Sequence, residues 1–310
     1  MIAAFRSTKG YYGQVGLRKK QKYVNSNISI NKITRYSAES DVRNPIKLLG
    51  DIAADAWSGR DLAWRLFLRN VRGMYRQTFL GLFWAFLPPI ANTAVWIFLR
   101  QQGVFDTGEM TVNATLYILT GMILWQSFAD AVMMPLKVLN QNKGMISKLR
   151  FSREALVILG LGEVFFDLAI RMLLLIPAFV WFGVSLSWAM LLAPLTIALM
   201  VVWASGIGLL LMPIGSLYQD VGRFLQLAIP FWMIITPIIY VAPETLPGSL
   251  LVWLNPASPL LLFSRDLILV GGSSFLLPAV LVGLMSVPLF LLGLVVFRIS
   301  IPVLVERMST

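Results

Sequence analysis

Long apolar segments separated by short polar ones make up most of the chain after residue 78. An α-helix needs about 20 apolar residues to cross a bilayer, and six segments are long enough. They are residues 79–99, 112–135, 155–183, 188–212, 224–241 and 276–297. Backbone polar groups find no water inside a bilayer, so spanning segments of this kind must be helical. The pattern therefore predicts an all-α membrane protein with six transmembrane helices.

A seventh apolar segment, residues 246–270, is interrupted by prolines and polar side chains. The interrupting residues are Pro247, Asn255, Pro256, Pro259, Arg265 and Asp266. These residues argue against a regular span. We expect a re-entrant pair of short helices between spans five and six, with its irregular backbone covered by protein or water.

Positive charge is distributed unevenly between the two sides of the predicted spans. Fifteen of the 26 Lys and Arg residues precede the first span. Five more, Lys137, Lys143, Lys148, Arg150 and Arg153, lie around the second connection, whereas the opposite-side connections hold only Arg100 and Arg265. Positive residues stay on the cytoplasmic side, so both termini are expected in the cytoplasm. This bias also explains the net charge of +11, and we expect no nucleic-acid partner.

The segment that precedes the first span, residues 51–78, has the pattern of an amphipathic helix. One arc carries Trp64, Phe67, Leu68, Val71, Met74 and Tyr75, and the adjacent arc carries Arg65, Arg69, Arg72 and Arg76. This is typical of a helix in the headgroup plane with its arginines on lipid phosphates; packing on a soluble partner is the alternative. We therefore divide the chain into a polar, basic N-terminal cytoplasmic extension (1–50), an interface helix region (51–78) and a six-span domain (79–310).

The composition excludes several kinds of chemistry. The chain has no histidine and no cysteine. It therefore holds no Cys/His zinc site, no Ser-His-Asp or Cys-His nucleophile pair and no disulfide. No glycine is followed by lysine, so there is no phosphate-binding P-loop. We expect no catalytic residue, no metal and no cofactor bound by this chain.

The second cytoplasmic connection combines basic residues with apolar ones at spacings of three and four, which predicts a short surface helix. Its candidate residues are Asn142, Met145, Ile146, Lys148, Phe151, Arg153 and Glu154. They leave two interpretations open. The segment is a solvated loop whose charge enforces topology, or a docking helix that inserts into a groove on a cytoplasmic partner.

Four ionisable residues fall inside predicted spans, where charge is unfavourable unless it is paired or hydrated. Asp130 lies in span two, and Glu163, Asp167 and Arg171 follow one another at four-residue intervals on one face of span three. We expect Asp167 and Arg171 to form a structural pair. A proton relay is the alternative.

Aromatic and small residues give two further predictions. Trp84, Trp125 and Trp232 lie away from the span ends, where interfacial tryptophans normally gather. Their flat faces could line a path for sugar rings, although lipid-facing or core packing also accounts for them. In span four, Ala204, Ser205, Gly206 and Gly208 predict close packing between helices.

Several short motifs occur along the chain in a characteristic order, at residues 75–89, 142–154, 217–220, 236–240 and 254–256, followed by Arg265. Together they resemble the permeases of polysaccharide and polyol-phosphate ABC exporters. These are the ABC-2 type membrane subunits for O-antigen, capsule or teichoic acid export. The motifs occur in the family's order within residues 61–265. Ser152 stands where the family has proline, and Gln219 stands where it has arginine.

The resemblance implies an assembly of two permeases with two nucleotide-binding ATPase subunits, which bind ATP and Mg. Residues 142–154 would form the coupling helix seated on the ATPase. The amphipathic segment would lie near the entry for a lipid-linked glycan, and residues 246–270 would shape the periplasmic exit. The function that follows is a permease subunit that exports a lipid-linked polysaccharide across the bacterial inner membrane. The alternatives are an ABC-2 permease for a drug or lipid, and an ATP-independent carrier or channel.

Overall fold

Helices are the regular elements throughout the part of the chain that the structure describes. The computed structural model describes residues 45–76, 81, 83–104, 108, 112–148, 151–185, 187–243, 245 and 248–309. The N-terminal extension up to residue 44 lies outside these ranges. The prediction of an all-α protein is confirmed for the described residues.

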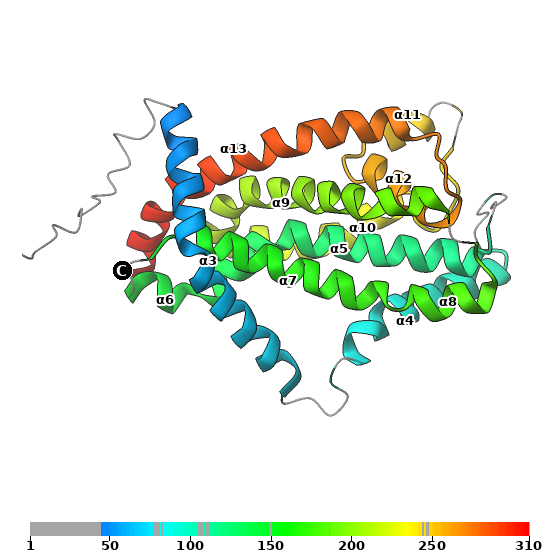
Figure 1. Cartoon of the computed structure of the whole chain (residues 1–310), viewed down its shortest axis with the longest axis horizontal. Helices are drawn as coiled ribbons and strands as arrows, with labels where there is room; N and C mark the ends of the chain where they lie inside the picture. Colours follow the sequence, from blue (N-terminus) through cyan, green and yellow to red (C-terminus); the bar gives the residue numbers. More distant parts are fainter. Residues whose placement is uncertain are drawn as a thin grey trace, which may run out of the picture. The chain divides into compact units, whose positions relative to one another are not determined.

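The helices follow one another along the chain with short connections. They are α3 (Pro45–Arg76), α4 (Phe83–Gln101), α5 (Ala114–Gln141), α6 (Lys143–Lys148), α7 (Glu154–Met172), α8 (Leu175–Phe182), η1 (Trp188–Leu192), α9 (Ala193–Leu217), α10 (Gln219–Ile235), α11 (Gly248–Leu254), α12 (Ser258–Leu269) and α13 (Leu276–Ser309). Figure 1 shows α6 and the C-terminal end of α13 at one end of the bundle, with α11 and α12 at the other. α3 runs steeply across the long helices near the α6 end.

Within the described residues, four helical segments are long and apolar enough to cross a membrane. They are Ala114–Gln141, Glu154–Phe182, Trp188–Leu217 and Leu276–Leu304. They coincide with predicted spans two, three, four and six, so a multi-pass membrane protein is supported. α4 and α10 occupy the places of spans one and five but have only 19 and 17 residues. At 1.5 Å per residue both fall short of the ~30 Å hydrocarbon core, and spans one and five stay predictions.

The fifth predicted span ends earlier than the sequence pattern indicates. We expected it to reach residue 241, but α10 ends at Ile235 and the next five residues are irregular. Pro237 disfavours helical backbone at Thr236, which adopts an extended conformation (φ −83°, ψ 132°). Hydropathy does not register this effect, because the residues that follow the break are as apolar as those before it.

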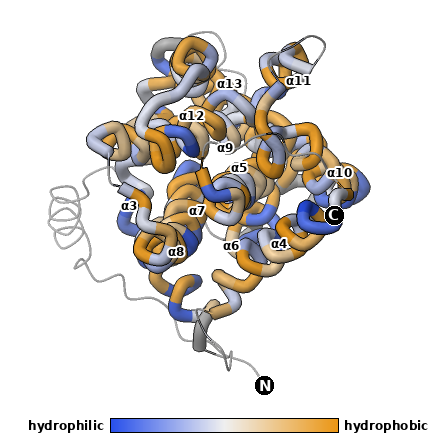
Figure 2. Tube along the Cα trace, turned by 90° about the vertical axis from the view of Figure 1, so that its right-hand side faces the viewer, coloured by the Kyte–Doolittle hydropathy of each residue, from blue (hydrophilic) through white to orange (hydrophobic). Residues whose placement is uncertain are grey.

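The core is built around α5, whose residues from Leu116 to Leu139 are mostly buried. α5 contacts α4, α7, α9, α10 and α12, and Figure 2 shows it among these helices in the end-on view. α9 packs between α5 and α13. A Cβ at Gly208 would collide with the backbone oxygen of Val132, and one at Gly206 would lie 3.1 Å from the backbone nitrogen of Phe290. The close packing that the small residues predict is therefore confirmed.

Candidate functional site

The segment predicted to couple to a partner contains a short helix, α6, directly after α5. Asn142 joins the two helices, since its Nδ2 donates to the Val138 oxygen at 2.8 Å. Its own backbone oxygen accepts from the N–H groups of Met145 and Ile146, each at 3.0 Å. Asn142 is buried, so its side chain fixes the turn between α5 and α6.

The apolar side chains of this segment point largely into the chain itself. Ile146 is buried, and Met145 and Phe151 pack half-buried against the hydrophobic core. We expected these three to face a partner. Gly144 is the most exposed of the described residues of α6. A Cβ added at Gly144 would meet no other atom within 4 Å. The Lys148 side chain lies outside the described residues. A contact between α6 and an ATPase stays a prediction.

The interface helix α3 packs one part of its apolar arc on α7. Phe67 lies edge-on to Phe166 with ring centroids 5.8 Å apart, and its ring faces Gly162. Trp64 stacks on Phe67 at 5.3 Å but stays 60% exposed. Phe67 therefore contacts α7 of the chain itself, where Gly162 leaves room for the ring. The placement of α3 in the headgroup plane stays a prediction.

The arginines of α3 keep the exposure expected of headgroup contacts. Arg65, Arg69 and Arg72 are exposed. Arg69 also donates to Oδ1 of Asn70 through Nη2 at 3.2 Å. The Arg76 side chain lies outside the described residues. Their role toward lipid phosphate stays a prediction.

Asn70 connects α3 to a charged pair between two spans. Its Nδ2 donates to Oε1 of Glu163 at 2.7 Å, and Oε2 of Glu163 lies 3.8 Å from Nζ of Lys137 on α5. The Glu163 side chain is only 4% exposed. The carboxylate is therefore compensated on both oxygens, as a buried charge requires.

The arginine of span three is paired between helices. Nη1 of Arg171 donates to Oδ2 of Asp130 on α5 at 2.7 Å. We expected the pair with Asp167, one turn earlier on the same helix, and the structure corrects this. Asp167 lies partly buried on the same face of α7. Sequence spacing identifies neighbours along one helix but not the carboxylate that an adjacent helix brings closer.

Two of the three candidate tryptophans lie together and the third does not. Trp125 stacks on Phe128 at 5.5 Å, and Trp232 lies edge-on to both rings at 5.9 and 5.2 Å. Trp125 is only 3% exposed, so core packing accounts for it in this conformation. Trp84, on α4, is 53% exposed. A glycan path along these residues stays a prediction.

Side chains from other elements form hydrogen bonds with the irregular segment after α10 and with the end of that helix. Asn255 accepts from the Trp232 indole N–H and donates to Thr236 Oγ1, both at 2.8 Å. Arg265 donates to the Pro237 oxygen at 2.9 Å, and the Tyr117 hydroxyl donates to the Tyr240 oxygen at 3.2 Å. Buried backbone carbonyl groups outside a regular helix need hydrogen-bond donors of this kind.

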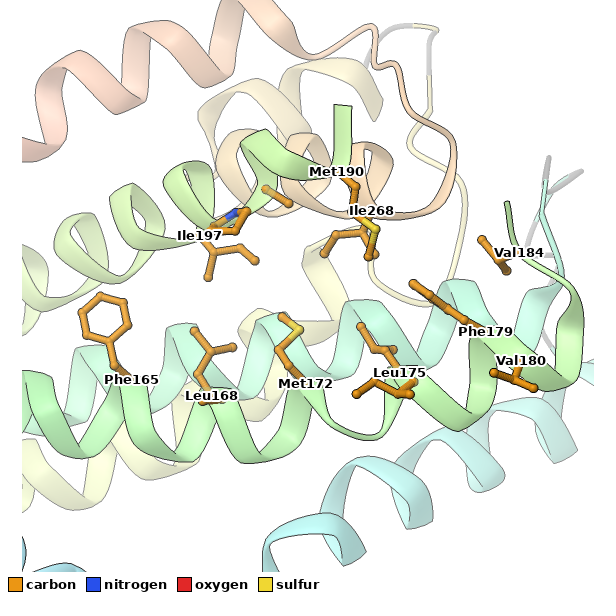
Figure 3. Close-up of a pocket in the computed structure, with 14 residues that line it drawn as sticks. Phe165, Leu168, Met172, Leu175, Phe179, Val180, Val184, Met190, Ile197 and Ile268 are labelled. Carbon is orange, nitrogen blue, oxygen red and sulfur yellow. The ribbon is translucent and has the colours of Figure 1, made fainter. Parts of the chain in front are cut away.

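A cavity of about 690 Å³ is lined only by apolar residues, and Figure 3 shows side chains of α7 and α8 facing those of α9 and Ile268 of α12. Another cavity, of about 480 Å³, lies beside Tyr117, Arg265 and Asp266 and is partly polar. Among the described residues, no group of acidic side chains is arranged to hold a metal ion.

Three curated permeases are similar to about two thirds of the chain. The O-antigen export system permease protein RfbA of Klebsiella pneumoniae is 26% identical over 215 residues, which are 67% of this chain and 80% of that protein. A second protein of that name and organism is 25% identical over 211 residues, 66% of this chain and 78% of that protein. The Myxococcus xanthus protein of the same name is 20% identical over 208 residues, 66% of this chain and 79% of that protein. No protein-family model matches the chain.

These similarities agree with the order of the short motifs and with the apolar helices, so the predicted resemblance is confirmed. They also indicate a transport subunit in place of an enzyme. The chain is thus similar to permeases of O-antigen export, in agreement with the resemblance to ABC-2 type permeases of polysaccharide exporters.

Proposed function

We propose that the chain is the permease subunit of an ATP-driven exporter that moves a lipid-linked polysaccharide across the bacterial inner membrane. The observation that carries this proposal is the match to an O-antigen export permease, which extends over 80% of that protein. Both termini lie in the cytoplasm, as the distribution of Lys and Arg predicts. The permease performs no covalent chemistry and provides a path with weak contacts at many points, because tight binding would stall a polymer.

Force is supplied by two ATPase subunits, which bind ATP and Mg and dock on α6. The placement of α6 supports this docking. It lies beside the C-terminal end of α13, at the end of the bundle opposite α11 and α12 (Figure 1). The permease itself binds no cofactor.

A second copy of the chain completes the conduit. α10 exposes three large apolar side chains on successive turns, Phe224, Leu227 and Phe231, each 67 or 68% exposed. α4 is similarly uncovered, with Trp84, Val95 and Phe98 each more than half exposed. A C2 pair would bring these helices together around one axis. The glycan would pass near Trp84 and Trp232, and near Trp125 once the core around it opens.

The arginines of α3 meet the phosphate of the lipid carrier. Arg65, Arg69 and Arg72 are exposed on a helix that crosses the spans steeply, as a helix in the headgroup plane would (Figure 1). Arg76 continues the same series in the sequence. A guanidinium binds phosphate through two parallel hydrogen bonds, which suits this task. Replacement of Arg65 and Arg69 by Gln should lower export without lowering the yield of the complex.

One observation favours a second candidate, a permease that exports a small lipid or drug. The 690 Å³ cavity between α7, α8 and α9 is lined only by apolar residues, and such a space suits a hydrocarbon better than a sugar. Narrowing it by Ala169→Phe should block export of a small apolar substrate. A polysaccharide that travels along the axis of a permease pair would be unaffected.

Co-purification with the ATPase tests the proposed function. Gly144→Glu adds a charged side chain on the exposed side of α6, where the chain leaves space. It should weaken association about tenfold or more, since ~1.4 kcal/mol at an interface has that effect. The matched control is Gly272→Glu, at an equally open, exposed glycine after α12. If both variants bind the ATPase as the wild type does, α6 is not the docking helix.

A further inference from the structure

A single arginine in the C-terminal half of α13 contacts two carboxylates from two other elements. Nη1 of Arg298 lies 2.8 Å from Oε1 of Glu154, the first residue of α7. The same nitrogen lies 2.9 Å from Oδ2 of Asp55 on α3. The Arg298 and Glu154 side chains are 11% and 7% exposed, so these contacts are largely shielded from water.

A hydroxyl strengthens the same junction. Ser152 donates through Oγ to the backbone oxygen of Asp55 at 2.6 Å, and its Oγ lies 3.2 Å from Oε2 of Glu154. The family that the sequence resembles has proline at this position, and proline has no hydroxyl to make this bond. In this chain Ser152 therefore ties the segment before α7 to the interface helix.

The α3 helix packs closely on the residues at the start of α7. A Cβ at Gly59 of α3 would lie 2.9 Å from both the Cβ of Ala155 and the Oγ of Ser152. α3 is therefore in direct contact with the start of α7, and α13 contacts both α3 and α6. The helices α3, α7 and α13 therefore meet within a few residues of α6, the helix that would receive force from the ATPase.

We propose that Arg298 is a positioning residue that couples α6 to the interface helix and to the last span. This inference rests on the proposed function. A push on α6 displaces Glu154 at the start of α7, and the guanidinium carries that displacement to Asp55 on α3 and to α13 itself. Buried charge-assisted bonds are strong and directional, and breaking one partner leaves an uncompensated charge. The three elements therefore move as a unit during transport.

The test compares Arg298→Gln, Asp55→Asn and the double variant in membranes that contain the full permease–ATPase complex. Three quantities are measured: the yield of the complex, its ATP hydrolysis and the amount of glycan exported. The matched control is Arg223→Gln, which removes an exposed arginine of an i,i+3 pair on α10. We expect each single variant to retain complex and hydrolysis but to export about tenfold less glycan per ATP. Because both residues act through one contact, their effects should not add. The double variant should export at least as much glycan per ATP as the single variant that exports less.

Each other outcome overturns the proposal. Export at the wild-type level would show that the bridge transmits nothing. Equal losses of complex, hydrolysis and export would show that Arg298 only stabilises the fold, and additive losses in the double variant would show two independent roles. The wild-type complex in the same membranes separates this inference from the proposed function. If the wild type neither binds the ATPase nor exports glycan, the proposed function fails, whatever the variants do.

Discussion

The guanidinium carbon of Arg265 lies 3.6 Å from the centre of the Tyr117 ring, so that α12 and α5 are joined by a cation–π contact inside the protein. Arg265 is only 2% exposed and also donates to the Pro237 oxygen. The same side chain thus holds three elements: α5, the irregular segment after α10, and α12. We interpret it as the anchor of the segment that the sequence predicts to be re-entrant.

Removal of this anchor should destabilise the permease strongly. Arg265→Ala leaves the buried Pro237 oxygen without its donor and removes the charge beside Asp266, whose Oδ1 lies 3.7 Å from Nε of Arg265. We expect a loss of roughly 2–4 kcal/mol in unfolding free energy, measured by denaturant titration of the detergent-purified protein. Arg223→Ala, at an exposed pair, should change it little. Equal stability of the two variants would contradict the anchor role.

The contact between α9 and α5 should not tolerate even one added methyl group at Gly208. Its Cβ would collide with the Val132 oxygen and lie 3.0 Å from Cδ of Pro135. Gly208→Ala should therefore destabilise the protein by about 1–3 kcal/mol, visible as a lower melting temperature. Gly50→Ala, in α3, is the control because a Cβ there meets nothing within 4 Å. It should be neutral or slightly stabilising. A Gly208→Ala protein that melts like the control would show that the helices can separate at no cost.

The Arg171–Asp130 pair should behave as one unit. Reversal of one charge, by Asp130→Arg alone, places two cations side by side inside the spans and should sharply reduce folded protein. Asp130→Arg combined with Arg171→Asp restores opposite charges and should recover a large part of the yield. Fluorescence-detected size exclusion of tagged protein gives the measurement. If the double variant is worse than either single one, the pair is not the relevant contact.

Cysteine cross-linking can test the proposed permease pair directly, because the chain has no cysteine of its own. Phe231→Cys on α10 should form a disulfide between two copies in the membrane if α10 lies near the two-fold axis. Leu284→Cys, on the exposed face of α13, is a control with similar exposure, 71% against 68%. It should stay monomeric on non-reducing gels. Cross-linking at Leu284 and not at Phe231 would show that the two copies meet through α13 and not through α10.

The sequence predicted the helices well where long apolar segments define them. Residues 112–135, 188–212 and 276–297 each fall within or close to a helical segment that is long and apolar enough to cross a membrane. The small residues around Gly208 also predicted a real contact. These features are local, since length, hydropathy and side-chain size are properties of a single segment.

The features that sequence reasoning missed depend on which helices become neighbours. The partner of Arg171 is Asp130 on another helix, and Phe67 is covered because α7 presents Gly162 to it. Ile146 has the spacing of a docking helix but faces its own chain. The end of α10 at Ile235 had a local signal in Pro237, although the apolar pattern continues past it. The Arg298 bridge had no local signal in the sequence, because Asp55, Glu154 and Arg298 are far apart along the chain.

Export by the reconstituted complex is the measurement that tests the central claim most directly. Proteoliposomes containing the permease and either the intact ATPase or a variant unable to hydrolyse ATP are supplied with lipid-linked glycan and MgATP. We predict that the glycan crosses the bilayer only with the intact ATPase, while both complexes assemble equally well. Glycan transfer at the same rate with the inactive ATPase, or with the permease alone, would contradict the account.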